Sequence, residues 1–137
     1  MRFMSIVTSP RSETYGNPTP ELLEAMGKLA DREIKAGRMI DNGGLMPIEQ
    51  GARITIRNGE LSVLDGPFVE AKEVIGGYAI SEFASKEEAV ALAVEFMQLH
   101  KDHMPDWEGT CEVRMFASPE MEQACEGGAK VVARVAS

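Results

Sequence analysis

The sequence predicts an α+β domain of the ferredoxin-like type, in which an antiparallel sheet carries two helices on one face. Apolar residues recur at three- and four-residue steps in two stretches, which is typical of amphipathic helices. Several short apolar or alternating runs are strand-like, and the order along the chain is strand, helix, strands, helix, strand. A chain of 137 residues suits a single domain. We expect a core over about residues 1–117 and a C-terminal extension over residues 118–137.

The first helix has clear start and stop signals. Residues 2–8 form a short strand-like run, and residues 9–18 are polar and rich in turn formers. Thr19 is a suitable N-cap, with Pro20 at the first helical position, and Gly37 is a plausible end. The apolar stripe between them consists of Leu22, Leu23, Met26, Leu29, Ala30 and Ile34. A short strand is possible at residues 38–40.

A β-hairpin is the strongest local signal. Residues 53–57 and 60–64 alternate in polarity on either side of Asn58–Gly59, a dipeptide that favours a two-residue primed turn. The expected cross-strand pairs are Arg57 with Glu60, Ile56 with Leu61, and Ile54 with Val63. Because side chains alternate along a strand, Asp65 falls on the face of Leu61 and Val63, which we expect to point toward the core.

The second half of the chain predicts a strand, a helix and a last strand. Residues 75–83 are strand-like, and Ser85 with Glu88 forms a capping box for a helix that ends near Met104–Pro105. Residues 110–116 form the last core strand. Beyond residue 118 we expect a short helix over 119–125 and an added strand over 130–135.

Composition and charge exclude several classes. The formal net charge of −8 disfavours binding to nucleic acid and to anionic membrane surfaces. No apolar run approaches the length that spans a bilayer. The two cysteines, Cys111 and Cys125, fit a reduced cytoplasmic protein better than a disulfide scaffold or a thiol enzyme.

The stretch Asp65–Gly66–Pro67–Phe68 resembles the Asp-Gly-Pro-Phe signature of the YCII-related family, in its DGPF-domain branch. The resemblance covers about residues 1–117 and also rests on Arg2–Phe3–Met4, residues 21–26 and Glu112–Val113–Arg114. The chain departs from the branch at Ala71, where a threonine is typical. The resemblance implies a ferredoxin-like fold that pairs as a dimeric α+β barrel.

A homodimer also follows from the predicted architecture itself. With both helices on one face of the sheet, the other face stays bare and needs a cover. A second copy of the chain supplies one with the closed symmetry that is usual for oligomers. We therefore expect the chain to be its own partner.

Asp65 is the first candidate for chemistry, because an acid in a partly apolar cleft can act as a general base or acid. The alternative is that it accepts backbone hydrogen bonds and shapes the turn that follows. Glu70 and Lys72 either bind a charged ligand or form part of a solvated charged loop. Tyr78 either lines the cleft or packs as a strand aromatic.

His100 lies on the apolar stripe of the second helix, as a cleft residue or as a core histidine. His100 with His103 and Asp102 or Asp106 has some likeness to a metal cluster, but nothing fixes a third ligand, so we expect no metal. Arg114 either binds an anion or pairs with Glu112.

Two functions remain open at this point. The first is cofactor-free acid–base catalysis on a small organic molecule, with Asp65 transferring a proton and Arg114 or Lys72 holding a substrate carboxylate. The second is a non-catalytic module that binds a small ligand or another protein. The sequence contains no phosphate-binding loop, dinucleotide fingerprint or serine-nucleophile elbow.

Overall fold

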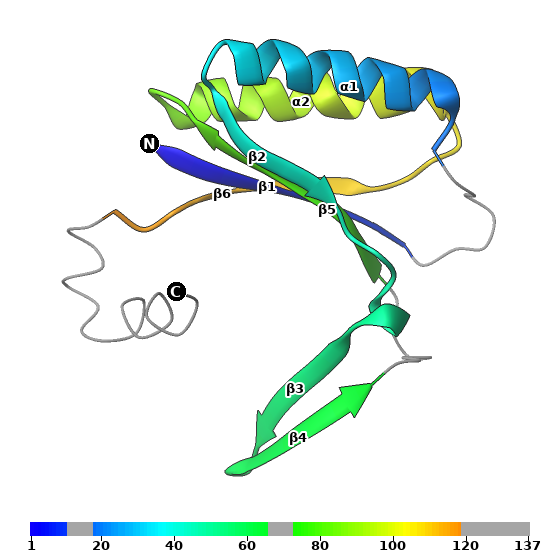
Figure 1. Ribbon diagram of the computed structural model, residues 1–137, viewed down its shortest axis with the longest axis vertical. Helices are drawn as coiled ribbons and strands as arrows, with labels where there is room; N and C mark the ends of the chain where they lie inside the picture. Colours follow the sequence, from blue (N-terminus) through cyan, green and yellow to red (C-terminus); the bar gives the residue numbers. More distant parts are fainter. Residues whose placement is uncertain (11–17, 66–72, 119–137) are drawn as a thin grey trace.

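The structure is a computed structural model that describes residues 1–10, 18–65 and 73–118 (Figure 1). Its elements in chain order are β1 (Arg2–Pro10), α1 (Pro20–Lys35), β2 (Met39–Gly44), the 3₁₀ turn η1 (Ile48–Gln50), β3 (Ala52–Arg57), β4 (Glu60–Asp65), β5 (Glu73–Glu82), α2 (Lys86–His103) and β6 (Thr110–Met115). The expected short helix and strand beyond residue 118 lie outside the described residues.

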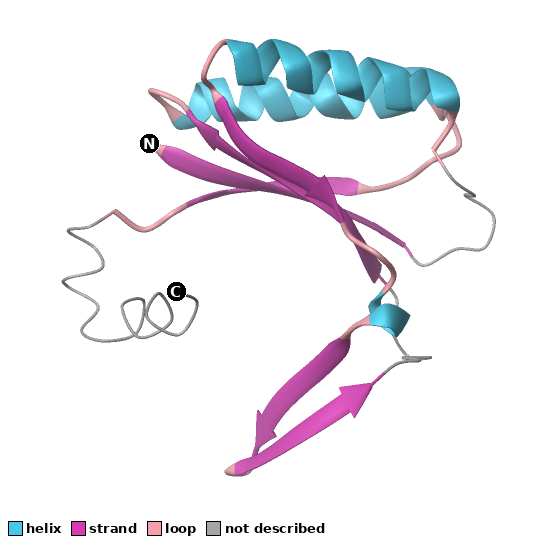
Figure 2. Ribbon diagram, in the orientation of Figure 1, coloured by secondary structure: helices cyan, strands magenta, loops and turns pink. Residues whose placement is uncertain are grey.

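Four strands form the main sheet in the order β2-β5-β1-β6, and each neighbouring pair is antiparallel. Both helices cover the same face of this sheet (Figures 1 and 2). With β3 and β4 set aside as an insertion, the order is that of a ferredoxin-like sheet, so the predicted α+β fold is confirmed. We call the face under the helices the inner face and the opposite one the outer face.

Both helices begin where the sequence predicts. The backbone N–H of Leu22 donates to Thr19 Oγ1 at 3.1 Å, and that of Glu88 donates to Ser85 Oγ at 3.3 Å. The Glu88 carboxylate accepts a hydrogen bond from the N–H of Ala84, so it closes the capping box one residue before the N-cap. These bonds satisfy backbone N–H groups that have no partner within the helix.

The core sits between the helices and the inner face. Phe3 of β1, Phe83 and Ala89 are buried together, and Leu92 and Val113 pack against them. The described helices include none that is long and apolar enough to cross a membrane.

The β3–β4 hairpin has the predicted turn and register. Asn58 and Gly59 have φ values of 53° and 77°, as a primed turn requires. Arg57 pairs with Glu60, Ile56 with Leu61, and Ile54 with Val63.

The expectation that this hairpin faces the core is wrong. Its apolar side chains are largely exposed: Ile54 61%, Ile56 71%, Leu61 67% and Val63 61%. The reason is that β3 and β4 form a separate two-stranded sheet, which projects away from the helices instead of packing beneath them (Figure 1).

A buried carboxylate ties α1 to its neighbours. Glu33 is 2% exposed and accepts hydrogen bonds from the guanidinium groups of Arg38 and Arg32. Arg32 also donates two hydrogen bonds to Glu95 of α2, at 2.7 and 2.8 Å. The hydrogen bonds from Arg38, and then those from Arg32, hold the pKa of Glu33 below its ordinary value although burial acts in the opposite direction.

Candidate functional site

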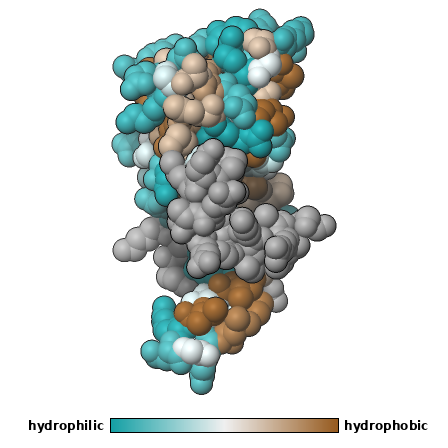
Figure 3. Space-filling view, turned by 90° about the vertical axis from the view of Figure 1, so that its left-hand side faces the viewer, coloured by the Kyte–Doolittle hydropathy of each residue, from teal (hydrophilic) through white to brown (hydrophobic). Residues whose placement is uncertain are grey.

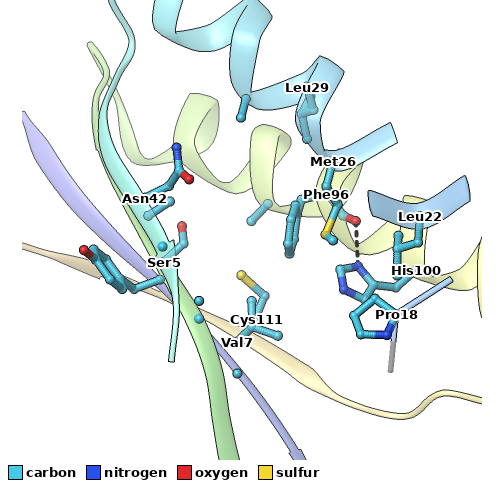
Figure 4. Close-up of a pocket in the computed structure, with 18 of the residues that line it drawn as sticks. Ser5, Val7, Pro18, Leu22, Met26, Leu29, Asn42, Phe96, His100 and Cys111 are labelled. Atoms are coloured by element: carbon cyan, nitrogen blue, oxygen red, sulfur yellow. Dashed lines mark hydrogen bonds between the residues drawn. The ribbon is translucent and has the colours of Figure 1, made fainter. Parts of the chain in front are cut away.

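A cavity of about 500 Å³ lies between the inner face of the main sheet and the two helices (Figure 4). Three sets of residues form its walls: Leu22, Met26 and Leu29 from α1; Ala93, Phe96 and His100 from α2; and Ser5, Val7, Asn42, Ala79 and Cys111 from the strands. Trp107, from the connection between α2 and β6, also lines it. A volume of this size is in the range of small-molecule sites.

The lining is mainly apolar and carries no formal charge. Among the described residues that border the cavity there is no Asp, Glu, Lys or Arg, and the inward-facing side chains that can titrate are His100 and Cys111. Because an isolated ion is costly to bury, such a lining favours an uncharged ligand.

His100 is held in one orientation by its neighbours. Its ring lies between Phe96 and Trp107, with centroid distances of 4.7 and 4.6 Å. Its Nδ1 is 3.1 Å from the carbonyl oxygen of Phe96, shown by the dashed line in Figure 4. Because a carbonyl oxygen can only accept, Nδ1 carries the proton and Nε2 presents a lone pair.

The His100 imidazole is neutral at ordinary pH and has a free acceptor. Burial lowers the pKa of His100, and the hydrogen bond to the Phe96 carbonyl opposes that shift. Nε2 makes no hydrogen bond to any residue that the structure describes. The same part of the chain contains no buried side-chain nitrogen or oxygen that lacks a partner, so Nε2 is not sealed from solvent. A molecule in the pocket can therefore donate to it.

Cys111 is a half-buried thiol on β6 whose side chain borders the same cavity (Figure 4). It forms no disulfide. Burial raises the pKa of its thiol, and a hydrogen bond with Ser5 acts in the opposite direction. Cys111 is therefore a weakly reactive thiol and not a thiolate nucleophile.

Tyr78 lies beside closely spaced glycines of β2 and β5, and its side chain is on the outer face, because it pairs with Ile6 and Gly43 in the strand register. Its hydroxyl donates a hydrogen bond to the Asp41 carboxylate at 3.1 Å, which raises the pKa of Tyr78. A Cβ atom on Gly77 would lie 2.8 Å from the carbonyl oxygen of Gly43, so the two strands need glycine there to approach each other.

Arg114 lies on the other side of the sheet from the pocket. Arg114 pairs with Met4 in the register of β6 against β1. Val113 packs against the core and Cys111 lines the cavity, so both lie on the inner face, and the alternation of side chains places Arg114 on the outer face. Its guanidinium is 3.5 Å from the Glu112 carboxylate, and its side chain is 69% exposed. The ion pair that the sequence allowed as the alternative is present, and any anion held by Arg114 would lie on the outer face.

The remaining predicted site residues lie at the edge of the described residues or outside them. Asp65 is opposite Ala52 at the end of β4, but its side chain lies outside the described part of the structure, as do Glu70 and Lys72. The prediction for Asp65 assumed that its strand faces the core. Because the apolar face of the hairpin is exposed, that assumption does not hold. Of the six predicted residues, the structure brings His100 to the pocket and places the side chains of Tyr78 and Arg114 on the outer face of the sheet.

Sequence reasoning missed most of this pocket. Phe96 has the pattern of an ordinary position on the apolar stripe of its helix, and nothing in the sequence singles out Ser5 or Trp107 as site residues. No three His, Cys, Asp or Glu side chains within the described ranges are grouped so that they could hold a metal ion.

Comparison with known families gives a single assignment. Residues 1–99 match the model of the YCII-related domain, which covers β1 through most of α2 and stops one residue before His100. No curated protein matches the chain significantly. The match spans more than half of the sequence and agrees with the observed fold. The chain therefore belongs to the YCII-related domain family.

Proposed function

We propose that the inner pocket binds an uncharged small organic molecule and that His100 transfers a proton to and from it, in acid–base catalysis without a cofactor. One observation carries this proposal. The Nε2 lone pair of a buried, neutral imidazole has no partner among the described residues and borders an apolar cavity.

The surroundings of His100 suit the role of a general base. The Phe96 carbonyl holds the proton on Nδ1, so the acceptor is always Nε2. When Nε2 takes a proton from a ligand, the imidazolium forms in a poorly solvated place, where its pKa is lowered. The cation then returns its proton readily, as a catalytic acid must.

Asp65 remains a candidate for a second proton carrier, at a cleft beside residues 66–73. Asp65→Asn keeps the shape of the side chain and removes its charge. If Asp65 takes part in turnover, this variant loses activity while the free energy of unfolding falls by less than about 1 kcal/mol. Equal turnover by both proteins would remove Asp65 from the mechanism.

The second candidate function is binding without catalysis. It is favoured by the described lining, in which Cys111 is the other inward-facing side chain that titrates, and its pKa is raised. A thiol acts as a base only in its ionised form, which is scarce here at neutral pH.

A binding screen tests the location of the site. We expect uncharged aromatic molecules with an O–H or N–H donor, such as phenols and indoles, to shift the NMR signals of His100 and Trp107. Ala79→Leu fills the pocket from β5 and should abolish these shifts. Ala91→Leu makes the same change on the exposed side of α2 and should leave them intact. Binding that survives Ala79→Leu would place the site elsewhere.

Deuterium exchange separates catalysis from binding. Ligands that bind and carry an acidic C–H bond are incubated with the protein in D₂O, and deuterium uptake is followed by NMR. Catalysis predicts uptake that depends on the wild-type protein and is lost in His100→Phe. Binding without uptake favours the second function.

We also propose that the outer face pairs with a second copy. No described helix covers this face (Figure 1), and the strand register places Met4, Ile6 and Ile80 on it, half-buried in the single chain. Burying such residues against each other stabilises a symmetric pair. Sedimentation equilibrium tests this, and a monomer at micromolar concentration would contradict it.

A further inference from the structure

We propose that the β3–β4 hairpin is an arm that grips a second copy of the chain and packs its apolar face against the outer sheet face of that copy. This inference rests on the proposed homodimer and adds to it a specific surface, the four side chains Ile54, Ile56, Leu61 and Val63, which we call the arm face.

The arm face is one continuous apolar surface. Ile54 pairs with Val63 and Ile56 with Leu61, so the four side chains lie on one side of the hairpin. They are 61–71% exposed, and Figure 3 shows a hydrophobic patch at this end of the molecule. The other side of the hairpin is mostly polar, since it carries Thr55, Ser62 and charged residues together with Leu64.

A hairpin of this kind needs a cover. An isolated two-stranded sheet is at best marginally stable in water, and it requires a third strand or a packed hydrophobic face. The structure gives β3 and β4 neither, because they hydrogen-bond only to each other among the strands described. The cover that the arm face lacks is therefore expected from outside the described part of the chain.

The direction of the arm points to a second copy. The hairpin projects from the side of the main sheet that is opposite the helices, which is the side of the outer face that no described helix covers (Figure 1). In a twofold dimer built on that face, each copy offers an arm and receives one. Each copy thus has an arm face that needs a cover and an outer sheet face that can cover the arm of its partner.

The area agrees with what a dimer requires. Burial of one aliphatic side chain removes roughly 60–120 Å² of apolar surface from water. At the observed exposure, the four side chains offer roughly 150–350 Å² per arm. Two arms and the surfaces that receive them bury roughly 600–1,400 Å², against about 1,200–2,000 Å² in a stable interface, so the sheet faces need to add only the remainder.

Charge does not oppose the same partner. The chain has a net charge of −8, so two copies repel each other in general. The β3–β4 hairpin adds nothing to that repulsion, because Arg53 and Arg57 balance Glu60 and Asp65. The outer face carries both signs, since Asp41 and Glu112 lie on the same side of the sheet as Arg114. An arm without net charge on a face of mixed charge adds no repulsion where the copies meet.

The first test compares dissociation constants by sedimentation equilibrium. The double variant Ile56→Thr/Leu61→Thr removes apolar bulk from the arm face and keeps residues with high strand propensity. We expect it to raise the dimer dissociation constant at least about tenfold. Leu64→Thr removes the same kind of bulk from the same strand on the opposite side and should change the constant by less than about threefold.

The second test uses only the wild-type chain, so it does not depend on how a variant folds. Amide hydrogen exchange is measured over residues 52–64 at concentrations above and below the dissociation constant. A gripped arm predicts protected amides that lose protection on dilution. Protection that does not change with dilution shows that the chain covers its own arm, and this overturns the inference.

The outcomes separate the two proposals. A chain that stays monomeric at all concentrations removes both the homodimer and the arm. A dimer whose dissociation constant is the same in the double variant keeps the homodimer and removes the arm. A weakened dimer together with an unchanged Leu64→Thr control supports both.

Discussion

His100 should couple the stability of this protein to pH in a range where few other groups titrate. Burial lowers the pKa of His100 below its ordinary value of 6.5, and the Phe96 carbonyl offsets only part of that shift. Unfolding returns the imidazole to water, so below about pH 6.5 the unfolded chain binds a proton that the folded chain resists. The free energy of unfolding therefore falls as the pH drops below 6.5, until the folded-state pKa is reached.

The pH dependence of the stability is limited, because His100 contributes the difference of at most one bound proton between the folded and unfolded states. The slope cannot exceed about 1.4 kcal/mol per pH unit, and between about pH 7.5 and 5.5 the total loss is at most about 1.4 kcal/mol. His100 is 7% exposed and its ring lies between two aromatic rings, so a loss of stability in this direction is expected within that limit. A loss of 1 kcal/mol corresponds to about 3–5 °C in melting temperature for a chain of this length.

The assay is urea unfolding of the wild type and of His100→Phe at about pH 7.5, 6.5 and 5.5. Phenylalanine keeps a ring between Phe96 and Trp107 and cannot titrate. The stability difference between the two proteins should change by up to about 1.4 kcal/mol in favour of the variant as the pH falls. The carboxylates of Glu33 and Glu95, whose pKa values are lowered, titrate below this pH range. Parallel stability curves for the two proteins would refute the neutral, desolvated state of His100.

Three further predictions follow from single residues. Glu33→Gln should lower the free energy of unfolding by about 1–3 kcal/mol near neutral pH, because the pKa of Glu33 is lowered and its stabilisation is present above about pH 4.5. Denaturant curves should show that this difference shrinks at acid pH, where the wild-type carboxylate becomes protonated. The control Glu24→Gln changes an exposed carboxylate and should cost under about 0.5 kcal/mol. Asn58→Val forces a β-branched residue to a φ of 53°, which should destabilise the hairpin by about 1–2 kcal/mol. Amide hydrogen exchange should become faster in the hairpin, with little change in the melting temperature of the main sheet, because the hairpin is a separate sheet. Unchanged exchange in the hairpin would contradict this. Iodoacetamide should modify Cys111 several-fold more slowly in the folded protein than in urea, since burial raises the thiol pKa, and equal rates by peptide mass spectrometry would argue against that burial.

The sequence was most informative where a short segment controls its own conformation. The helix starts at Thr19 and Ser85 were predicted because a capping side chain bonds to a backbone N–H only a few residues away. The hairpin turn was predicted because Asn58 and Gly59 tolerate positive φ, and the register followed from the turn. The family resemblance was confirmed over residues 1–99.

The candidate site was predicted only in part. His100 was placed correctly on the apolar stripe of its helix, and it borders a pocket. A cleft was expected beside Asp65, whereas the pocket that His100 borders lies under the helices. Trp107 was not predicted as a neighbour of His100, because their contact depends on how the chain leaves α2.

Local periodicity, capping and turn chemistry by themselves determined the helices, most of the strands, the hairpin register and the α+β class, whereas β2 extends to Gly44, beyond the short strand expected at 38–40. Those features depend on interactions between residues near one another in the chain, which the sequence displays directly. Only the tertiary structure decided which apolar faces are covered. The alternation of Ile54 and Ile56 reads like a core strand, but their exposure depends on where the whole hairpin lies relative to the main sheet. Burial is a relation between distant elements, so the same apolar pattern produces a filled core under α1 and α2 and an uncovered arm at β3 and β4.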